Sequence, residues 1–548
     1  MSVLNNSLLL GADAASGYTI SRSLRFNSAD SAYLSRTPAS AGNRKTWTWA
    51  GWVKRSNSDS SNAEVFGAGS NNLSLSLIGD NINVYEYNGS STLWQRSTTA
   101  VYRDFSAWYH VVLAYDTTQA TASNRIRLYI NGAEVTQFST NTNPTLNFDG
   151  YVNNNIVHYI CYQSISGRYF NGYLADIHFI DGQALDPTSF GEFSVTTGVW
   201  MPKAYTGTYG TNGFKLNFSD NSTAAALGTD SSGAGNTWTV NNLSVTAGAG
   251  NDSLVDVPVN GSQTDTGAGG EVRGNYPTWN PLAPGANATF ANGNLDLTIS
   301  PPSTAEGRIG NFYFPSGKWY WEMTVTVVSS EYPHVGLTPR NNLVGANVDS
   351  DSTGYCIRMT GKIDALASSN QTYGTSYATG DIVMFAFDVD AGKLWYGKNG
   401  TWQASGNPAS GTNPSSSSIS TTTPYTFAAS GFGGPVAVLN MGQRPFAYTA
   451  PSGFKALCTA NLPAGTITTS GTFTGNANAE GPFVYLNGVP TAMTINGNAV
   501  TFATHADKLS NGFKVRTSSG SYNTAGSNTY SVSTTGANFK NARAQSNP

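Results

Sequence analysis

Aromatic rings accompanied by amide and hydroxyl side chains are the groups in this sequence whose chemistry points most clearly to a function. Aromatic faces stack on the apolar faces of sugar rings, and short amide and hydroxyl groups form hydrogen bonds with sugar hydroxyls. Both kinds occur together in segments that we expect to be loops. The candidate ligand-binding residues are Tyr85, Tyr87, Trp94, Tyr332, His334, Arg358, Tyr373, Tyr377 and Trp402. Because many aromatic residues fill protein cores, these residues indicate a surface rather than a defined pocket.

The titratable residues form no recognisable catalytic or metal-binding pattern. Hydrolysis of a glycosidic bond needs two carboxyl groups about 5–10 Å apart. The nearest acidic groups are Asp176, Asp181 and Asp186, and the pair Asp388 and Asp390; we interpret that pair as turn residues. The sequence contains no G-x-S-x-G motif and no closely spaced pair of histidines. We therefore predict no enzyme activity, no cofactor and no metal.

Two details of the titratable residues stay open. Loop carboxylates at Asp116, Asp149 or Asp181 could bind calcium, although aspartate in a turn is the more frequent case. His110 and His178 lie between apolar residues in segments that read as strands, so we expect them to be buried structural histidines.

Charge and apolar patterning exclude several classes of protein. The 548 residues include 29 Lys+Arg and 32 Asp+Glu, a net charge of -3, which excludes a nucleic-acid-binding surface of the usual basic kind. No apolar stretch approaches the 18 or so residues of a membrane-spanning helix, and the N-terminus lacks a secretory signal. We therefore expect that the protein does not insert into a membrane and that it is assembled in a cytoplasm. The three cysteines, Cys161, Cys356 and Cys458, lie far apart and read as small buried hydrophobes.

Turn signals predict an all-β protein. Asn-Gly pairs separate alternating segments along the chain, and this dipeptide tolerates the positive φ angles of a tight hairpin turn. The pattern of residues 125–138 predicts a strand, a turn and a second strand, and residues 393–405 show the same pattern. In WYHVVLAYD (108–116), Tyr109, Val111, Leu113 and Tyr115 share one face. A short helix is expected only after Asp186.

Composition divides the chain into tandem β-sandwiches. The expected parts are an N-terminal attachment arm (1–20), a first sandwich (21–200), a packed bridge rich in Gly, Ser and Thr (201–272), a second sandwich (273–454), a linker (455–470) and a small C-terminal β domain (471–548). The bridge contains apolar residues such as Trp238, so we expect it to pack against its neighbours.

Two parts of the chain resemble known domains. WTWAGWVKR (47–55), WYHVVLAYD and LYINGAEV (128–135) resemble the concanavalin A-like jelly roll of laminin-G and pentraxin domains. GKWYWEM (317–323), GDIVMFAFDVDAGKLWYGKNGTW (380–402) and VLNMGQRPFAY (438–448) resemble the SPRY, or B30.2-like, domain, with Met441 in place of the usual Phe. The resemblance implies two binding scaffolds, a jelly roll followed by a SPRY sandwich.

The combination of these two domains with the sequence segments 197–222, 452–463 and 483–517 resembles virion proteins of tailed bacteriophages. This resemblance implies a non-enzymatic structural subunit, a tail fibre or appendage, that binds a host-surface glycan during adsorption. It further implies a homotrimer attached to other virion proteins through the N-terminal arm, located in the virion and assembled in the host bacterial cytoplasm.

Three other functions remain as alternatives. The first is a head fibre or capsid decoration protein. The second is a glycan depolymerase, which the absence of the glucanase motifs E-x-D-x-x-E and E-x-D-x-E disfavours. The third is a SPRY adaptor that binds a short peptide, which is disfavoured because no RING, coiled coil or basic region accompanies the domain.

Overall fold

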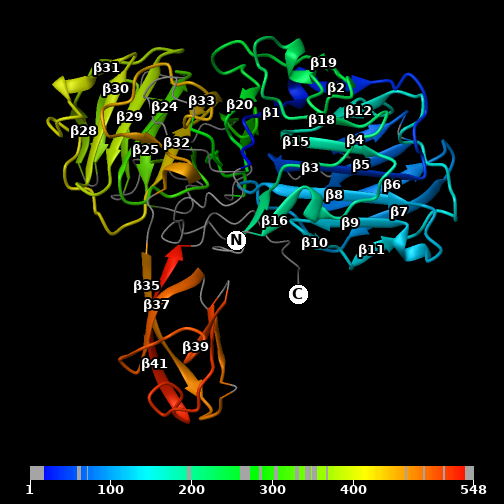
Figure 1. Ribbon diagram of the computed structural model, residues 1–548. Helices are drawn as coiled ribbons and strands as arrows, with labels where there is room; N and C mark the ends of the chain where they lie inside the picture. The colour runs from blue at the N-terminus through cyan, green and yellow to red at the C-terminus, as the bar shows by residue number, and fades with distance from the viewer. Residues whose placement is uncertain are drawn as a thin grey trace.

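The computed structural model shows three β-structured bodies (Figure 1). It describes residues 18–57, 63–70, 72–193, 199–258, 272–282, 287–300, 306–327, 332–339, 347–348, 354–365, 368–462, 466–479, 481–485, 488–509 and 512–536. Within these ranges, the regular elements are β-strands and 3₁₀ helices of three or four residues, which confirms the all-β prediction. No helix in the same ranges has the length and apolar character needed to cross a membrane.

The first sandwich consists of two sheets. In spatial order, the first sheet contains β10 (Ala133–Glu134), β9 (Ile126–Ile130), β8 (Tyr109–Asp116), β3 (Thr46–Arg55), β15 (Gly172–Asp181), β1 (Ser23–Phe26) and β20 (Ser253–Leu254), with β18 (Phe214–Leu216) also paired to β15. The second contains β11 (Phe138–Asn141), β7 (Thr92–Thr98), β6 (Asn81–Tyr87), β5 (Leu73–Ile78), β4 (Ala63–Ala68), β12 (His158–Ile160), β2 (Tyr33–Arg36) and β19 (Thr239–Asn241).

Short elements complete this part of the chain. The hairpin of β13 (Tyr162–Gln163) and β14 (Arg168–Tyr169) lies against β4, and β16 (Gly191–Phe193) pairs with β17 (Trp200–Pro202). The 3₁₀ helices are η2 (Ser28–Asp30), η3 (Ala122–Asn124), η4 (Pro187–Ser189) and η5 (Ala225–Gly228). The short helix expected after Asp186 is therefore present, and the Asp186 carboxylate accepts a hydrogen bond from the Thr188 backbone N–H at its start.

Local patterns explain these strands. On β8, Tyr109, Val111, Leu113 and Tyr115 all lie in the core between the sheets, as the alternation predicts. Between β9 and β10, Asn131 and Gly132 have φ angles of 49° and 80°, the two positive values of the predicted hairpin turn.

Residues 201–258 do not form a body of their own. They contribute β18, β19 and β20 to the two sheets of the first sandwich, and Trp238 and Leu243 are buried in its core. At the other end, Tyr18 and Ile20 pack against the outer face of the first sheet. The expected attachment arm otherwise lies outside the described residues.

The second sandwich also has two sheets. The first contains β21 (Ala288–Ala291), β22 (Asp296–Ile299), β33 (Gly434–Asn440), β24 (Lys318–Val325), β29 (Ile382–Asp388), β30 (Lys393–Lys398) and β31 (Thr401–Trp402), with β34 (Lys455–Ala456) parallel to β24. The second contains β23 (Glu306–Ile309), β32 (Thr426–Gly431), β25 (His334–Thr338), β26 (Tyr355–Ile357), β27 (Lys362–Ala365) and β28 (Ser368–Thr372). Two 3₁₀ helices, η6 (Gln403–Ser405) and η7 (Thr459–Asn461), belong to this part.

The start of the expected linker differs from the prediction. Residues 455–462 belong to the second sandwich, because β34 pairs with β24 and because Leu457, Cys458, Ala460 and Leu462 are buried in its core. A composition of small and polar residues does not reveal a strand whose partner is distant in the sequence.

The third body is a small β module. One sheet contains β35 (Thr466–Gly475), β41 (Gly526–Gly536), β37 (Gly488–Ile495) and β38 (Asn498–Ala499), and the other contains β36 (Phe483–Tyr485), β40 (Gly512–Val515) and β39 (Ala506–Leu509). β35 and β41 are antiparallel and pair from Thr466 opposite Thr535 to Gly475 opposite Gly526. The module extends away from the two large sandwiches (Figure 1).

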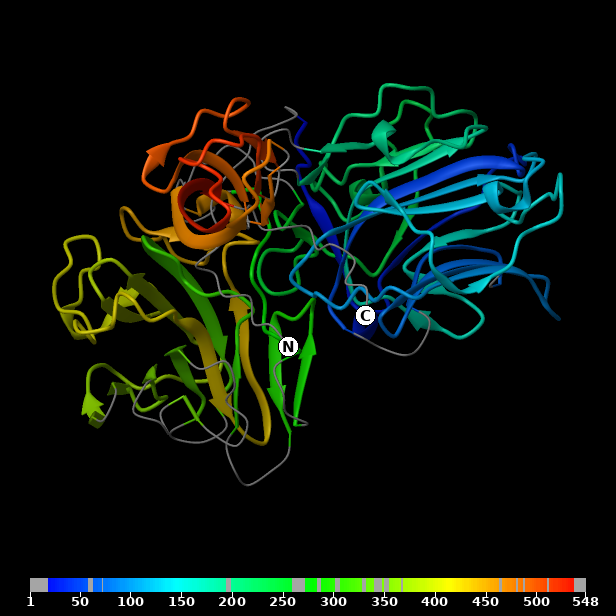
Figure 2. The same ribbon diagram turned by 90° about the horizontal axis from the view of Figure 1, so that it is seen from below.

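The two large sandwiches lie side by side in both views (Figure 1 and Figure 2). Hydrogen bonds cross between them. The Tyr173 hydroxyl donates to the Gly293 carbonyl at 2.7 Å, and the Asn27 side-chain amide donates to Asn292 Oδ1 at 2.7 Å. Their relative position is thus set by specific polar contacts.

Candidate functional site

On the outer face of the second sheet of the first sandwich, strand register aligns a row of aromatic and hydroxyl residues, of which Ser74 is covered by other side chains and buried. Tyr85 lies opposite Ser74, and Ser74 lies opposite Gly67. Gly67 in turn lies opposite Tyr159, and Tyr159 lies opposite Ser35. Because directly opposed residues share one face of a sheet, register alone brings residues from β6, β5, β4, β12 and β2 together.

Four tyrosines gather at one end of this face, and we call them the tyrosine patch: Tyr33, Tyr159, Tyr162 and Tyr169. Tyr33 and Tyr159 project from β2 and β12, whereas Tyr162 and Tyr169 face each other across the β13–β14 hairpin. The Tyr162 ring centroid lies 4.7 Å from Tyr33, 4.7 Å from Tyr169 and 5.2 Å from Tyr159. All four side chains are partly exposed, so their rings form a continuous aromatic surface.

The surroundings of the tyrosine patch combine apolar and polar groups. Ile165, in the turn of the hairpin, is 59% exposed. The Asn241 side-chain amide donates to the Ser35 hydroxyl at 3.3 Å, beside Tyr33 on β2. Burial and the neighbouring tyrosines raise the pKa of Tyr33 and that of Tyr162, so both hydroxyls stay protonated at neutral pH. The patch thus offers ring faces together with neutral hydrogen-bonding groups.

The predicted residues of the first sandwich lie on strands rather than on loops. Tyr85 and Tyr87 are on β6 and are partly exposed, and Tyr85 belongs to the row described above. Trp94 was placed wrongly. It lies on β7 at 0% exposure and donates from Nε1 to Glu86 Oε2 at 2.8 Å, so its ring is part of the core and cannot stack on a ligand.

Three predicted residues of the second sandwich lie near one another. The rings of Tyr332 and His334 stack with centroids 4.2 Å apart and planes 8° apart. His334 is 1% exposed on β25, and Arg358 is 9% exposed directly after β26. Only Tyr332 of these three has a partly exposed side chain.

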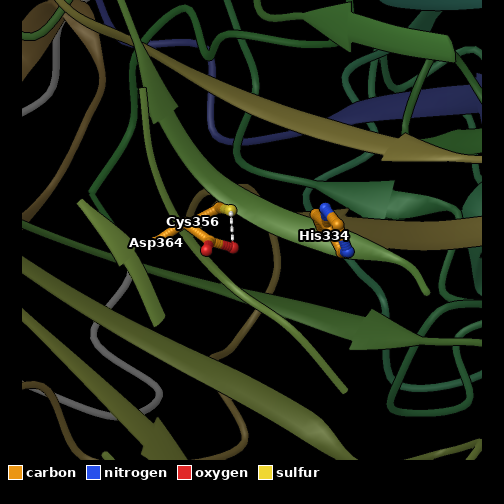
Figure 3. A group of neighbouring side chains, drawn as sticks. All are labelled: His334, Cys356 and Asp364. Carbon is orange, nitrogen blue, oxygen red and sulfur yellow. Dashed lines mark hydrogen bonds between the residues drawn. The ribbon is translucent and has the colours of Figure 1, made fainter. Parts of the chain in front are cut away.

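His334 also belongs to a group of possible metal ligands with Cys356 and Asp364 (Figure 3). Among the described residues, this is the group whose ligand atoms lie within 4.8 Å of one another, and it offers the nitrogen, sulfur and oxygen ligands that zinc binds. However, Arg358 Nε donates to Asp364 Oδ2 at 2.5 Å, and its Nη2 donates to Oδ1 at 3.1 Å. A cation would have to share this carboxylate with a guanidinium, so we interpret the group as a buried ion-pair cluster.

The other three predicted residues lie near the opposite sheet. Tyr377 is 5% exposed, and its hydroxyl donates to the Gly397 carbonyl at 3.1 Å. Tyr373 contacts the Tyr396 ring edge-on, with centroids 6.2 Å apart. Trp402, on β31, is partly exposed and contacts Tyr320. The side chains that can reach a ligand are therefore Tyr373 and Trp402.

Three of the carboxylates considered for catalysis accept hydrogen bonds from backbone N–H groups. Asp388 accepts a hydrogen bond from the Ala391 N–H at 3.0 Å, and Asp390 accepts one from the Gly317 N–H at 3.1 Å. Asp181 accepts from the Asn43 N–H at 2.9 Å. The Asp388 bond closes a local backbone turn, as the sequence predicts, whereas the bonds of Asp390 and Asp181 join segments that are far apart in the chain.

The two strand histidines are buried as predicted, each at 1% exposure. Burial lowers the pKa of His110 to about 3, and its Nδ1 accepts a hydrogen bond from Trp200 Nε1 at 3.1 Å. His178 Nε2 lies 3.2 Å from Asp176 Oδ2, and the Tyr18 hydroxyl donates to the other oxygen of that carboxylate at 2.8 Å. These groups satisfy one another inside the protein.

Comparison with known families gives names to the two sandwiches. Residues 27–189 match the concanavalin A-like lectin/glucanases superfamily, and residues 318–415 match the SPRY domain family. The chain carries a concanavalin A-like domain followed by a SPRY domain. The predicted order of the two domains is thus confirmed. Domains of these two kinds typically act in binding rather than in catalysis, which indicates a binding role for this chain.

Solved structures add only a distant likeness. The SPRY domain of human HERC1 is 16% identical over 30% of this chain and 95% of that chain, with a TM-score of 0.25. The stonustoxin structure is 16% identical over 30% of this chain and 27% of that chain, with a TM-score of 0.23. Such low scores carry no argument about function. No curated protein matches the sequence.

Proposed function

We propose that this chain is a structural subunit of a tailed bacteriophage particle, a tail fibre or appendage, that binds a host-surface glycan without cleaving it. The observation that carries the glycan-binding part is the tyrosine patch of the concanavalin A-like domain. Sugar rings present apolar C–H faces that stack on aromatic rings, and their hydroxyls bond to neutral donors and acceptors such as Ser35 and Asn241. A surface without a dominant charge suits a neutral polysaccharide.

The remaining parts of the proposal rest on the resemblance to phage virion proteins. The N-terminal arm attaches the subunit to other virion proteins, and three copies form a homotrimer. Three equivalent patches on one particle component multiply a weak affinity for each sugar when the copies bind the same polysaccharide. The protein would then reside in the virion after assembly in the bacterial cytoplasm.

A binding measurement with purified full-length protein tests the patch. We expect Tyr162→Ala to weaken binding to immobilised host-surface polysaccharide about tenfold, because one ring in contact with three others contributes about 1–1.5 kcal/mol. Tyr205→Ala, which removes a partly exposed tyrosine on the outer face of the first sheet of the same domain, is the matched control and should leave binding unchanged. Equal affinity of the wild type and Tyr162→Ala would move the site elsewhere, and absence of polysaccharide binding by the wild type would refute glycan recognition.

Immunolabelling of intact virions tests the location. An antibody against residues 275–454 should label the tail or its fibres in negative-stain micrographs. Label spread over the head would refute the tail assignment and would favour a head fibre or capsid decoration protein. Release of soluble oligosaccharide from the polysaccharide by the purified chain would instead show a depolymerase.

A further inference from the structure

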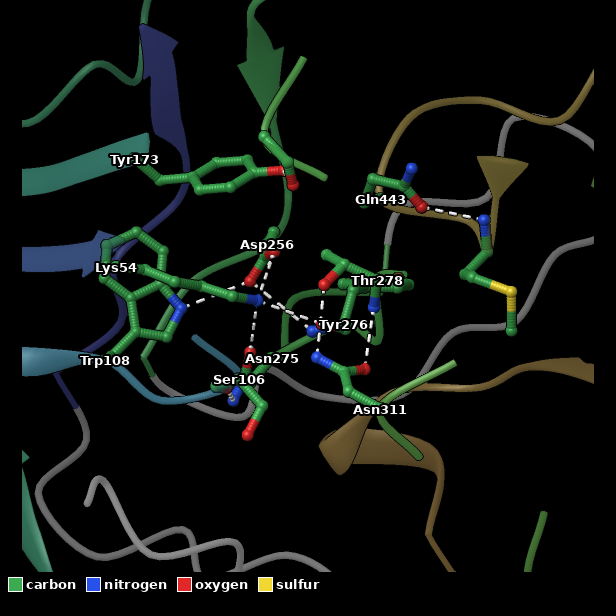
Figure 4. Close-up of polar contacts among 12 residues, drawn as sticks. Lys54, Ser106, Trp108, Tyr173, Asp256, Asn275, Tyr276, Thr278, Asn311 and Gln443 are labelled. Atoms are coloured by element: carbon green, nitrogen blue, oxygen red, sulfur yellow. Dashed lines mark hydrogen bonds and ion pairs between the residues drawn. The ribbon is translucent and has the colours of Figure 1, made fainter. Parts of the chain in front are cut away.

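The amine of Lys54 is completely buried between the concanavalin A-like domain and the segment that leads into the SPRY domain (Figure 4). Lys54 Nζ donates to Asp256 Oδ2 at 2.7 Å, to Asn275 Oδ1 at 2.7 Å and to the Tyr276 carbonyl at 2.9 Å. Its own strand is β3, and Asn275 lies 221 residues further along the chain. An amine, a carboxyl group and a primary amide therefore converge on one point.

The amide of Asn275 is held in a fixed orientation. Its Nδ2 donates to the Ser106 carbonyl at 2.7 Å, which leaves Oδ1 directed at the lysine. The Asn275 backbone N–H donates to Thr459 Oγ1 at 2.9 Å, and the Thr459 N–H donates back to the Asn275 carbonyl at 3.0 Å. Because side chain and backbone are both fixed, the amide carbon stays next to the lysine nitrogen.

Asp256 is placed to move a proton within this group. Its Oδ2 bonds to Lys54 Nζ, while its Oδ1 accepts from Trp108 Nε1 at 3.1 Å. Burial lowers the pKa of Lys54 and raises the pKa of Asp256, so both shifts favour the neutral amine and the neutral acid over the ion pair. The Tyr173 ring, whose centroid is 5.5 Å from Nζ, adds an apolar wall.

We infer that Lys54 and Asn275 become joined by an intramolecular isopeptide bond, with Asp256 acting as base and then as acid. Asp256 takes a proton from the Lys54 ammonium, and the Nζ lone pair attacks the Asn275 amide carbon. The resulting tetrahedral centre collapses, the bond to Nδ2 breaks, and Nδ2 leaves as ammonia with the proton that Asp256 returns. Asp256 then takes the second proton from Nζ, so the new amide nitrogen keeps one hydrogen and Asp256 ends as the neutral acid. An amide and ammonia are formed from an amine and a primary amide, so no oxidant or co-reactant is needed.

The environment favours this reaction over the alternatives. Water is excluded, since Lys54 and Asp256 side chains are 0% and 1% exposed, so the new amide is protected from hydrolysis. A direct amide between Lys54 and Asp256 would use up the only carboxyl group bonded to the amine among the described residues, leaving no acid for the departing oxygen. In the reaction with Asn275 the leaving group is ammonia, and Asp256 is a separate carboxyl group that can protonate it.

Peptide mapping of the purified full-length protein tests the bond. Trypsin should yield residues 46–55 covalently joined to residues 274–308, with Lys54 uncleaved and a mass about 17 Da below the sum of the two peptides, the mass of one ammonia. The linked peptide is decisive, because succinimide formation at Asn-Gly sites also releases ammonia but joins no peptides. Recovery of the two peptides only in separate form would overturn the inference, as would a Lys54–Asp256 linkage with loss of water.

Variants identify the roles of the three residues. Lys54→Met and Asp256→Asn should each abolish the linked peptide, whereas Lys215→Met, at a lysine that lies 3.7 Å from a different buried carboxylate, should retain it. A linked peptide that persists in Asp256→Asn would contradict the role of this carboxyl group. Should either variant fail to fold, the map of the wild-type protein still decides whether the bond exists.

Discussion

Replacement of Glu86 by glutamine tests how a buried carboxyl group makes the stability of the concanavalin A-like domain depend on pH. Glu86 is 0% exposed, and its oxygens accept hydrogen bonds from Trp94 Nε1 at 2.8 Å and from the Tyr151 N–H at 2.9 Å. Burial, only partly offset by these bonds, raises the pKa of Glu86 from 4.5 to about 7. The folded protein thus binds a proton more tightly than the unfolded chain does.

The sign of the effect follows from this difference in pKa. Between pH 4.5 and about 7, the folded state holds a proton that the unfolded state has lost, so the free energy of unfolding falls as the pH rises. The fall amounts to about 3 kcal/mol for a pKa change of this size in a fully buried group. Glutamine does not titrate, so Glu86→Gln should lack this part of the pH dependence.

The glutamine also has a cost that does not depend on pH. The glutamine side chain ends in an oxygen atom and an NH₂ group. The NH₂ group faces the N–H of either Trp94 or Tyr151 and leaves that buried donor without an acceptor, which costs about 1–3 kcal/mol of stability. We therefore expect Glu86→Gln to be less stable than the wild type at pH 4.5. At pH 8 it should be equally stable, or more stable by up to about 2 kcal/mol.

Urea unfolding followed by tryptophan fluorescence from pH 4.5 to 8.5 measures this difference. The comparison of variant and wild type cancels the contributions of other titrating groups, and the transition of the first domain must be followed separately because the chain has several domains. Glu134→Gln, at an exposed glutamate of the same domain, is the control and should parallel the wild type. A stability difference between Glu86→Gln and wild type that stays constant across this range would refute the reasoning.

Three further predictions concern buried contacts. Asp252→Ala should lower the free energy of unfolding by about 3–5 kcal/mol in urea titrations, because Arg25, bonded to Asp252 at 3.0 and 3.2 Å, would remain buried without its counter-charge. Gly132→Ala should destabilise by about 1–3 kcal/mol and lower the midpoint of thermal unfolding, because the φ angle is +80° and the new Cβ would lie 2.4 Å from the Trp200 ring. Because burial lowers the pKa of His110 to about 3, the unfolded chain takes up a proton at pH values where the folded protein does not, so the free energy of unfolding should fall as the pH drops below 6.5. The free energy of unfolding of His110→Asn should fall less in the same acid titration.

Local patterns in the sequence were sufficient to predict some of the strands, but not β6 and β7, whose aromatic residues we expected in loops. The hairpin of β9 and β10 follows from alternation and from Asn131–Gly132, and the inward face of β8 follows from the positions of its aromatic and aliphatic residues. These features depend on residues close together in the chain. Pairing between segments that are distant in the chain cannot be predicted in this way. Residues 455–462 are an example, since nothing local marks them as partners of β24.

The candidate site depended on register, which the sequence does not reveal. Tyr33, Tyr159, Tyr162 and Tyr169 come from four strands, and only the pairing of β2 with β12 and of β13 with β14 brings the rings together. Alternation with buried neighbours, Leu34 after Tyr33 and Ile160 after Tyr159, was a local signal that could have marked these two tyrosines as outward.

Adjacent apolar residues caused the opposite error at Trp94. Leu93 and Trp94 are neighbours on β7, so alternation cannot decide which of them faces the core. The structure shows that Trp94 does, because the buried carboxylate of Glu86 accepts its indole N–H. That pairing of a buried acid with an aromatic donor has no signature in the linear sequence.

The antiparallel pairing of β35 with β41 has a mechanical consequence. Thr466, where the chain enters the third module, lies opposite Thr535, near the end of β41. A pulling force applied at these two points loads the first hydrogen bonds of the ladder and then each following pair in turn, rather than all pairs together. Under tension between Thr466 and Thr535, this module therefore opens one residue pair at a time and extends the chain.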